Sequence, residues 1–229
     1  MKIFKLAALI AVAIFSLTAC GPNMVTKKQA YGEMYKEKPV SLLVLPPINQ
    51  STAADAKEFY DTTIAEPLTL HGYYVFPIEV IDSIMRNEGY PDTEELVNVP
   101  PQKFKDLFGA DAVMFIVIKK WDTSYYVIGG NVKVSISYII KSTTTGDVLW
   151  RYHDTLKVDT TGQNRVGGIA GLVLQTVETA VKTAMTNYVP IARRLNFIAL
   201  NAIPAGKYSP VYEKDMKQRI SKSQTQPEK

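Results

Sequence analysis

The chain has 229 residues, enough for one domain of ordinary size, and its 46% hydrophobic and 21% charged residues are typical of a folded chain, not a disordered one. The formal net charge of +4 is too small to indicate nucleic acid as a partner. The single cysteine excludes a disulfide framework and a Cys-rich metal site, and the two histidines leave little material for a zinc enzyme.

The first nineteen residues are typical of a bacterial lipoprotein signal peptide. Lys2 and Lys5 precede an apolar run at 6–15, which is too short to span a bilayer but fits a signal peptide. Residues 17–21 read LTACG and resemble a lipobox, whose cysteine carries a thioether-linked diacylglycerol. We predict cleavage before Cys20 and acylation of that residue, with palmitate among the acyl chains. Several acyl chains give firm membrane anchoring.

The predicted mature chain carries 24 cationic and 22 anionic residues, a net charge of 24 minus 22, or +2. Its second residue is Gly21 and not aspartate. By resemblance to the sorting rule of Gram-negative lipoproteins, this predicts the outer membrane, facing the periplasm or the cell surface. We expect a lipidated tether at 20–38, a single α/β domain at 39–212 and a basic, disordered tail at 213–229.

The first half of the domain alternates predicted strands and helices, which implies parallel crossover connections. Apolar runs predict the strands, and apolar residues at three- and four-residue spacing predict the helices. Pro67 is expected to kink or break the first helix. In chain order the predicted elements are a strand at 40–45, a helix at 56–68, a strand at 73–76, helices at 80–87 and 101–108, and a central strand at 112–118.

The second half changes to an antiparallel pattern. Apolar and polar residues alternate from Val132 to Lys141, as expected for a strand with one wet face. A turn-like stretch and a partner strand at 148–152 follow, and Gly129-Gly130 marks a bulge or turn before the long strand. A closing helix is predicted from Val166 to Tyr188, ending before Pro190. The expected fold class is therefore α/β with a mixed sheet, parallel βαβαβ first and then an antiparallel hairpin.

Three phrases carry a resemblance to known envelope proteins: VSLLVLPPIN, HGYYVFP and FGADAVMFIVI. They resemble the TolB amino-terminal type of α/β domain, which the curli-secretion channel lipoprotein and penicillin-binding-protein activators share. The mature chain is most similar to a family of Gram-negative outer-membrane lipoproteins of unknown function. The resemblance supplies no catalytic residues, and the chain shows no clear pair of amphipathic membrane hairpins.

The residues offer little chemistry for an enzyme. The sequence contains no G-x-S-x-G, Walker or H-E-x-x-H motif. His71 is read as a capping or surface residue and His153 as a surface residue, while turn chemistry accounts for Asp111. Asp55, Glu58 and Asp61 share helical spacing, which favours a solvated face over paired acid–base catalysis. We predict no catalytic residue, cofactor or metal.

Gly167 and Gly171 lie four residues apart in the last predicted helix, a spacing that lets two backbones approach closely. This seam is read either as internal packing on the sheet or as an interface. Tyrosines suit interfaces because they combine a large contact area with a polar tip. Those placed outside the predicted core are Tyr31, Tyr35, Tyr125, Tyr126, Tyr208 and Tyr212.

Three functions remain open from the sequence. The favoured one is a non-enzymatic accessory subunit of an envelope assembly or secretion complex, bound to the membrane through Cys20 and to a protein partner such as another lipoprotein. The second is a transport auxiliary lipoprotein, which would need a deep apolar pocket. The third is an envelope hydrolase, which would need a pocket that gathers the helix carboxylates.

Overall fold

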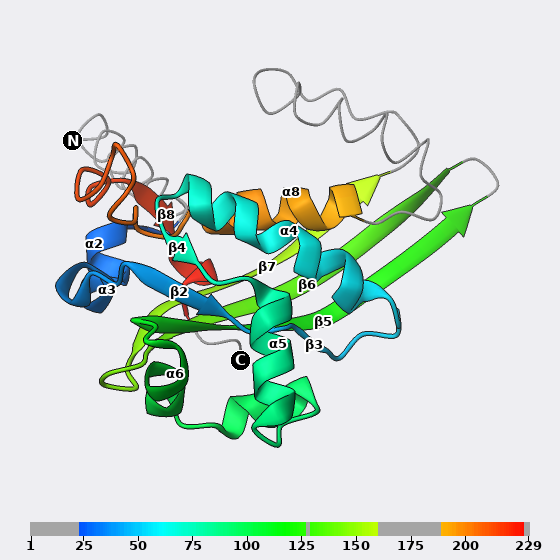
Figure 1. The fold of residues 1–229 in the computed structure, drawn as a ribbon. Coiled ribbons are helices and arrows are strands. Elements are labelled where there is room, and N and C mark those ends of the chain that lie inside the picture. The colour runs from blue at the N-terminus through cyan, green and yellow to red at the C-terminus, as the bar shows by residue number, and fades with distance from the viewer. Residues whose placement is uncertain (1–22, 127–128, 160–188, 227–229) are drawn as a thin grey trace, which may run out of the picture.

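A computed structural model describes residues 23–126, 129–159 and 189–226, with side chains omitted at 123–132 and 158–159. A mixed sheet has the order β4-β2-β5-β6-β7, with β3 paired to β5 beside β2 (Figure 1). The bounds are β2 Ser41–Val44, β3 Ile48–Asn49, β4 Tyr74–Val75, β5 Ala112–Tyr126, β6 Gly129–Ser142 and β7 Val148–Asp159. The first four of these strands pair in parallel and the β5–β6–β7 ladder is antiparallel, which confirms the predicted fold class.

Helices cover both faces of the sheet. The helices α4 (Ala56–Leu70) and α8 (Val189–Leu200) lie on one face, and α5 (Ile78–Asn87) and α6 (Pro101–Phe108) lie on the other, next to the 3-10 helix η1 (Thr93–Asn98). Alternate residues of β2 therefore serve two cores: Leu42 packs with the α4 and α8 side, and Leu43 packs with the α5 and α6 side. The prediction of a strand buried on both faces is confirmed.

The predicted helices are present with small differences. Pro67 does not break α4, which continues to Leu70; the His71 amide bonds to the Pro67 carbonyl (3.0 Å), and Pro67 is itself buried. In α5 the predicted core residues Ile81 and Met85 are buried, but Ile84 is exposed. Ile78, two residues before the predicted start, is also buried, in the core on the α4 and α8 side.

The antiparallel strands are longer than predicted. β5 continues eight residues beyond the expected end at Ile118, across a register shift between Ile118 and Lys120, and Trp121 is buried on this extension. The polar Lys119-Lys120 pair interrupts the apolar run and so hides the continuation. Gly129 and Gly130 are the first residues of β6, paired with β5, and not a separate bulge.

A helix follows the residues at which the closing helix is predicted. The expected helix at 166–188 and its Gly167–Gly171 seam fall outside the described residues. The described helix α8 occupies 189–200 and includes Pro190. Its Leu195, Ala199 and Leu200 are buried against the core.

Both ends of the described chain are folded, which corrects two predictions. Residues expected in the tether form β1 (Met24–Thr26), α2 (Lys27–Ala30) and α3 (Gly32–Glu37). Residues expected in the tail form β8 (Arg219–Ser221) and η2 (Lys222–Gln224), and β8 pairs antiparallel with β1. The physical reason is non-local: each segment is too short and polar to fold alone, and each supplies the other's hydrogen-bond partners.

Candidate functional site at the junction of the terminal segments

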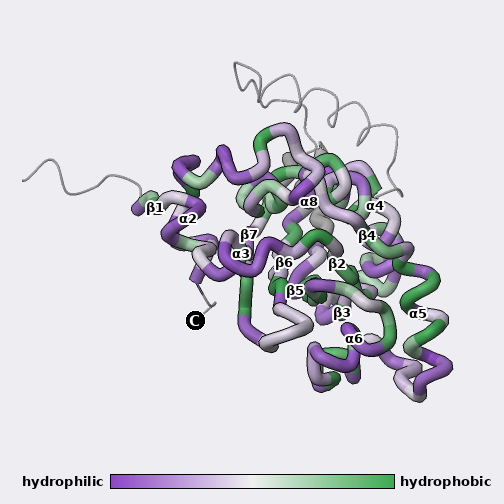
Figure 2. The backbone as a smooth tube through the Cα atoms, turned by 60° about the vertical axis from the view of Figure 1, so that its left-hand side comes forward, coloured by the Kyte–Doolittle hydropathy of each residue, from purple (hydrophilic) through white to green (hydrophobic). Residues whose placement is uncertain are grey.

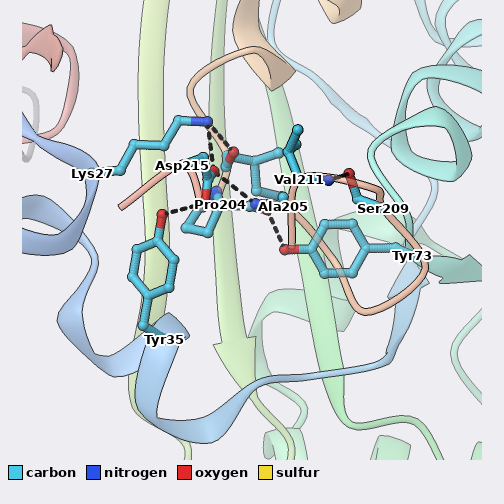
Figure 3. Close-up of polar contacts among 9 residues, drawn as sticks. Lys27, Tyr35, Tyr73, Pro204, Ala205, Ser209, Val211 and Asp215 are labelled. Atoms are coloured by element: carbon cyan, nitrogen blue, oxygen red, sulfur yellow. Dashed lines mark hydrogen bonds and ion pairs between the residues drawn. The ribbon is translucent and has the colours of Figure 1, made fainter. Parts of the chain in front are cut away.

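A buried ion pair joins the two terminal segments. Lys27 Nζ lies 3.1 Å from Asp215 Oδ2 and donates a second hydrogen bond to the Ile203 carbonyl at 2.6 Å. The two side chains are only 3% and 8% exposed. Figure 3 shows the lysine of α2 and the aspartate of the C-terminal segment pointing toward each other between the two ends of the chain. Buried charges of this kind require complete pairing.

Three further bonds complete what we call the terminal junction, formed by Lys27, Tyr35, Tyr73, Ala205 and Asp215. The Tyr35 hydroxyl donates to Asp215 Oδ1 (3.0 Å), and the Ala205 amide donates to Asp215 Oδ2 (2.9 Å). The Tyr73 hydroxyl donates to the Pro204 carbonyl (2.6 Å). Both carboxylate oxygens of Asp215 therefore accept hydrogen bonds. The loop at 203–215 is bonded to Lys27, Tyr35 and Tyr73, which come from three different parts of the chain.

The electrostatics of the junction follow from burial. Desolvation lowers the pKa of Lys27, partly offset by its hydrogen bond and attraction to Asp215. Desolvation raises the pKa of Tyr35, and the negative charge of Asp215 raises it further. The Tyr35 hydroxyl therefore stays protonated and acts as a donor to Asp215. These hydrogen bonds join the N-terminal segment to the C-terminal one.

Two glycines bring the turn after α4 against the same loop. The Gly206 amide donates to the His71 carbonyl (2.8 Å), and the Tyr208 amide donates to the Gly72 carbonyl (3.0 Å). A Cβ on Gly206 would lie 2.4 Å from the Gly72 oxygen. His71 occupies the C-cap of α4, as predicted, and desolvation together with the nearby Lys27 charge lowers its pKa.

The predicted carboxylates do not form a catalytic pair. Asp55, at the N-cap of α4, and Glu58 are exposed, as expected for a solvated face, whereas Asp61 is partly buried. Burial raises the pKa of Asp61 to about 7, and the charges of Asp82 and Glu79 contribute. Its Oδ1 atom has no hydrogen-bond partner among the described residues.

This environment makes Asp61 a destabilising charge at neutral pH. Asp61→Asn is expected to raise the free energy of unfolding at pH 8 by about 1–3 kcal/mol, since three pKa units give a ceiling of roughly 4 kcal/mol that partial solvent access reduces. The folded carboxyl binds its proton more tightly than the unfolded one, so wild-type stability from this group falls as pH rises from about 4 to 7.

Urea denaturation of both proteins at pH 4 and pH 8 measures this effect. The gain from Asp61→Asn should appear at pH 8 and shrink to about 0.5 kcal/mol or less near pH 4, where the Asp61 carboxyl is protonated in the folded state and about half protonated in the unfolded state. Glu58→Gln on the exposed face is the control and should change neither value by more than about 0.5 kcal/mol. A gain of equal size at both pH values would show that charge is not the cause.

The other predicted polar residues have structural positions. Asp111 Oδ2 accepts hydrogen bonds from the Val40 amide, the Ser41 amide and the Ser41 hydroxyl, each at 3.0 Å, and thereby fixes the start of β2 beside β5. His153 lies in β7 opposite Ser137 and is partly buried. Among the described residues, no group of three His, Cys, Asp or Glu side chains could hold a metal ion.

A cleft between β6, β7 and α8 is the candidate for ligand carriage. Its cavity volume is about 10 Å³, room for about one water molecule, and it is lined by Ile136, Tyr138, Tyr152, Asp154, Leu156, Leu195, Ile198 and Ala199. Ligand pockets typically hold roughly 300–1,000 Å³. This cleft is therefore too small to supply the deep pocket that a transport auxiliary lipoprotein requires.

The tyrosine predictions divide. Tyr31 and Tyr35 were expected outside the core but are buried, at 3% and 9% exposure. Tyr31 packs against Trp150 with ring centroids 6.2 Å apart. Tyr208 is 68% exposed, as predicted. The backbones of Tyr125 and Tyr126 pair in β5, and their side chains lie outside the description.

A local signal for the terminal junction was present in the sequence. Thr26 and Gln29 form a capping box, in which the Thr26 hydroxyl accepts from the Gln29 amide while the Gln29 side chain accepts from the Thr26 amide. This T-x-x-Q phrase, followed by Tyr31, Met34 and Tyr35 at helical spacing, indicates folded structure before residue 38. No comparable local signal marks Asp215, whose partner is 188 residues away.

Comparisons with known proteins point to one family. A family model described as "Putative lipoprotein GNA1162-like" matches residues 29–206. The "Putative lipoprotein NMB1124/NMB1162" of Neisseria meningitidis serogroup B (strain ATCC BAA-335 / MC58) is 27% identical over 175 residues, or 76% of this chain and 80% of that protein.

One solved structure of this kind of lipoprotein is similar to the chain. The crystal structure of lipoprotein GNA1162 from Neisseria meningitidis is similar with a TM-score of 0.52 and 28% identity, covering 63% of this chain and 99% of that one. A PelC dodecamer from Paraburkholderia phytofirmans gives a TM-score of 0.38 and 16% identity, covering 67% of this chain and 88% of that one. In the described part of the chain, no helix has the length and apolarity needed to cross a bilayer.

Proposed function

Because the chain belongs to the GNA1162-like family of lipoproteins, we propose that it is a non-enzymatic accessory subunit of a cell-envelope assembly, anchored in the outer membrane by acyl chains on Cys20. Family membership supports an envelope lipoprotein, and neither the family nor the Neisseria relative is described as an enzyme. The sorting residue Gly21 supports the outer membrane as its location.

The observation that carries the proposal is the terminal junction. The segment that follows Cys20 is not a long tether, since β1 begins at Met24 and Lys27 is locked onto Asp215. Folded structure therefore begins only a few residues after Cys20, the proposed site of lipid attachment. A rigid body attached this closely suits a component that holds a partner at a set height above the membrane.

Exposed apolar side chains support a protein partner. Val80 and Ile84 lie one turn apart on α5 and are 52% and 36% exposed. Figure 1 shows α5 on the face of the sheet opposite α4 and α8. Exposed apolar residues on one helix face are a common feature of protein interfaces.

One experiment in intact cells tests both parts of the proposal. A photo-crosslinking amino acid at Val80 is expected to yield a discrete protein adduct, and the chain should carry acyl mass and sediment with the outer membrane. Cys20→Ala should abolish the acyl mass, the outer-membrane sedimentation and the adduct together.

The crosslinker placed at Glu58, on the exposed face of α4, is the control and should give no adduct. If the Cys20→Ala variant kept its acyl mass and its outer-membrane sedimentation, the anchoring proposal would be wrong. If Val80 gave no protein adduct in correctly lipidated cells, the accessory role through α5 would be wrong while the anchoring stood.

A further inference from the structure

Charge is distributed very unevenly along the folded chain. The two terminal segments, 23–38 and 201–226, contain nine lysines and arginines against four aspartates and glutamates, a net charge of nine minus four, or +5. The intervening residues 39–200 contain 14 cations and 17 anions, or −3. A protein whose overall charge is close to neutral therefore carries a strongly basic portion.

The structure gathers this basic portion at one end. Figure 1 shows β1, α2, α3, β8 and the loop before β8 together at the end where the described chain begins, with the tips of β5 and β6 at the opposite end. Figure 2 shows that the backbone of α2 and α3 is largely hydrophilic, whereas α5 carries a long hydrophobic stretch. We call the part made by 23–38 and 201–226 the basic end.

The four acidic residues of the basic end are all engaged. Asp215 pairs with Lys27, Glu213 pairs with Lys38 (2.6 Å) and Glu33 pairs with Lys36 (3.0 Å), while Glu37 accepts a hydrogen bond from Thr145. The remaining cations form no ion pair with a described residue; they are Lys28, Lys207, Lys214, Lys217, Arg219 and Lys222. All of these except the partly buried Lys222 are exposed.

Apolar side chains accompany these charges. Tyr208 is 68% exposed and Val211 is 51% exposed, both on the loop that carries Lys207 and Lys214. An aromatic ring with a polar tip, placed among lysines, is the combination found on protein surfaces that rest in the headgroup region of a bilayer.

The proposed lipid attachment lies next to this end. Met24 is the fourth residue after Cys20, and a fully extended chain covers at most about 3.6 Å per residue, so β1 begins within about 14 Å of the acylated residue. The attraction of basic residues to anionic headgroups extends over about one Debye length, roughly 8 Å at physiological salt. The connection is therefore short enough for the basic end to come within one Debye length of the lipid headgroups.

We propose that the basic end is a membrane-binding surface that rests on anionic phospholipid headgroups, so that the acyl chains and this surface together fix the orientation of the domain. The proposal rests on the lipid anchoring proposed above. The exposed lysines and Arg219 bind lipid phosphates, and Tyr208 and Val211 enter the headgroup layer. The tips of β5 and β6 then point away from the membrane.

Vesicle binding of the mature chain with Cys20→Ser, which carries no acyl group, isolates this surface from the anchor. The chain should sediment with phosphatidylglycerol-rich vesicles at low salt and should be released as salt rises. It should bind phosphatidylcholine vesicles far more weakly. The triple variant Lys207→Gln, Lys217→Gln, Arg219→Gln should bind phosphatidylglycerol vesicles about 100-fold more weakly, since each basic residue near the surface contributes roughly fivefold.

The matched control is Arg86→Gln, Lys105→Gln, Lys120→Gln, which removes the same charge from exposed residues outside the basic end. It should bind like the parent chain, and melting temperatures would show that both triple variants are folded. Equal weakening by the two variants, or binding that ignores lipid charge and salt, would overturn the proposal. Because Cys20 acylation is measured separately in cells, failure here leaves the anchoring proposal standing, and the converse also holds.

Discussion

Asp215→Ala is expected to lower the free energy of unfolding by about 3–5 kcal/mol, the cost typical of breaking one partner of a buried ion pair. The change strands the Lys27 ammonium, which is 3% exposed, and leaves the Tyr35 hydroxyl and the Ala205 amide without their acceptor. Urea denaturation measures the loss, and hydrogen exchange should show faster exchange in β1 and β8 than in the main sheet.

Glu213→Ala is the matched control for this prediction. Glu213 also joins the C-terminal segment to the N-terminal one, through Lys38, but these two side chains are 39% and 48% exposed. Exposed pairs contribute about 0–1 kcal/mol, so the control should change little. If the two variants lost similar amounts of unfolding free energy, the buried ion pair would stabilise the terminal segments no more than the exposed pair does.

Gly206→Ala is expected to cost about 3 kcal/mol or more, because the new methyl group meets backbone and cannot be relieved by a rotamer change. The added Cβ would lie 2.4 Å from the Gly72 oxygen and 2.6 Å from its carbonyl carbon. Either the 203–209 loop or the turn at Gly72 must move, and the two hydrogen bonds between them would be lost. Thermal unfolding monitored by circular dichroism measures the effect.

Gly32→Ala provides the comparison. A Cβ on Gly32 meets nothing within 4 Å, and the residue begins α3, so alanine should be neutral or stabilise the fold by up to about 1 kcal/mol. Opposite signs for these two substitutions are expected. If Gly206→Ala proved as harmless as Gly32→Ala, the close approach between Gly72 and Gly206 would not exist in solution.

The elements that sequence patterns predicted are those whose cause is local. The three- and four-residue spacing in α4, the two-residue alternation in β6 and the apolar run of β2 each record which face is buried. Such patterns predict the element and its buried face without knowledge of the neighbour. The patterns give wrong results where polarity and burial disagree. Polar Lys119 and Lys120 lie inside the strand β5, and apolar Ile84 is exposed.

The predictions about function divide in the same way. The lipobox at Cys20 is a short linear motif that an enzyme reads from an extended chain, so sequence alone predicts it, and it remains a prediction. Asp61 shows the opposite case: three carboxylates at helical spacing indicated a solvated face, but only the tertiary packing buries Asp61 while it leaves Asp55 and Glu58 exposed. The raised pKa of Asp61 follows from that packing.

The sequence by itself determined the mixed α/β class and the order of the first-half elements, since periodicity acts over a few residues. Only the tertiary structure decided that the terminal segments are folded, that Tyr31 and Tyr35 are buried, and that Lys27 pairs with Asp215. These features depend on contacts between residues far apart in the chain. A short polar segment carries no record of a partner 188 residues away until the fold brings the two together.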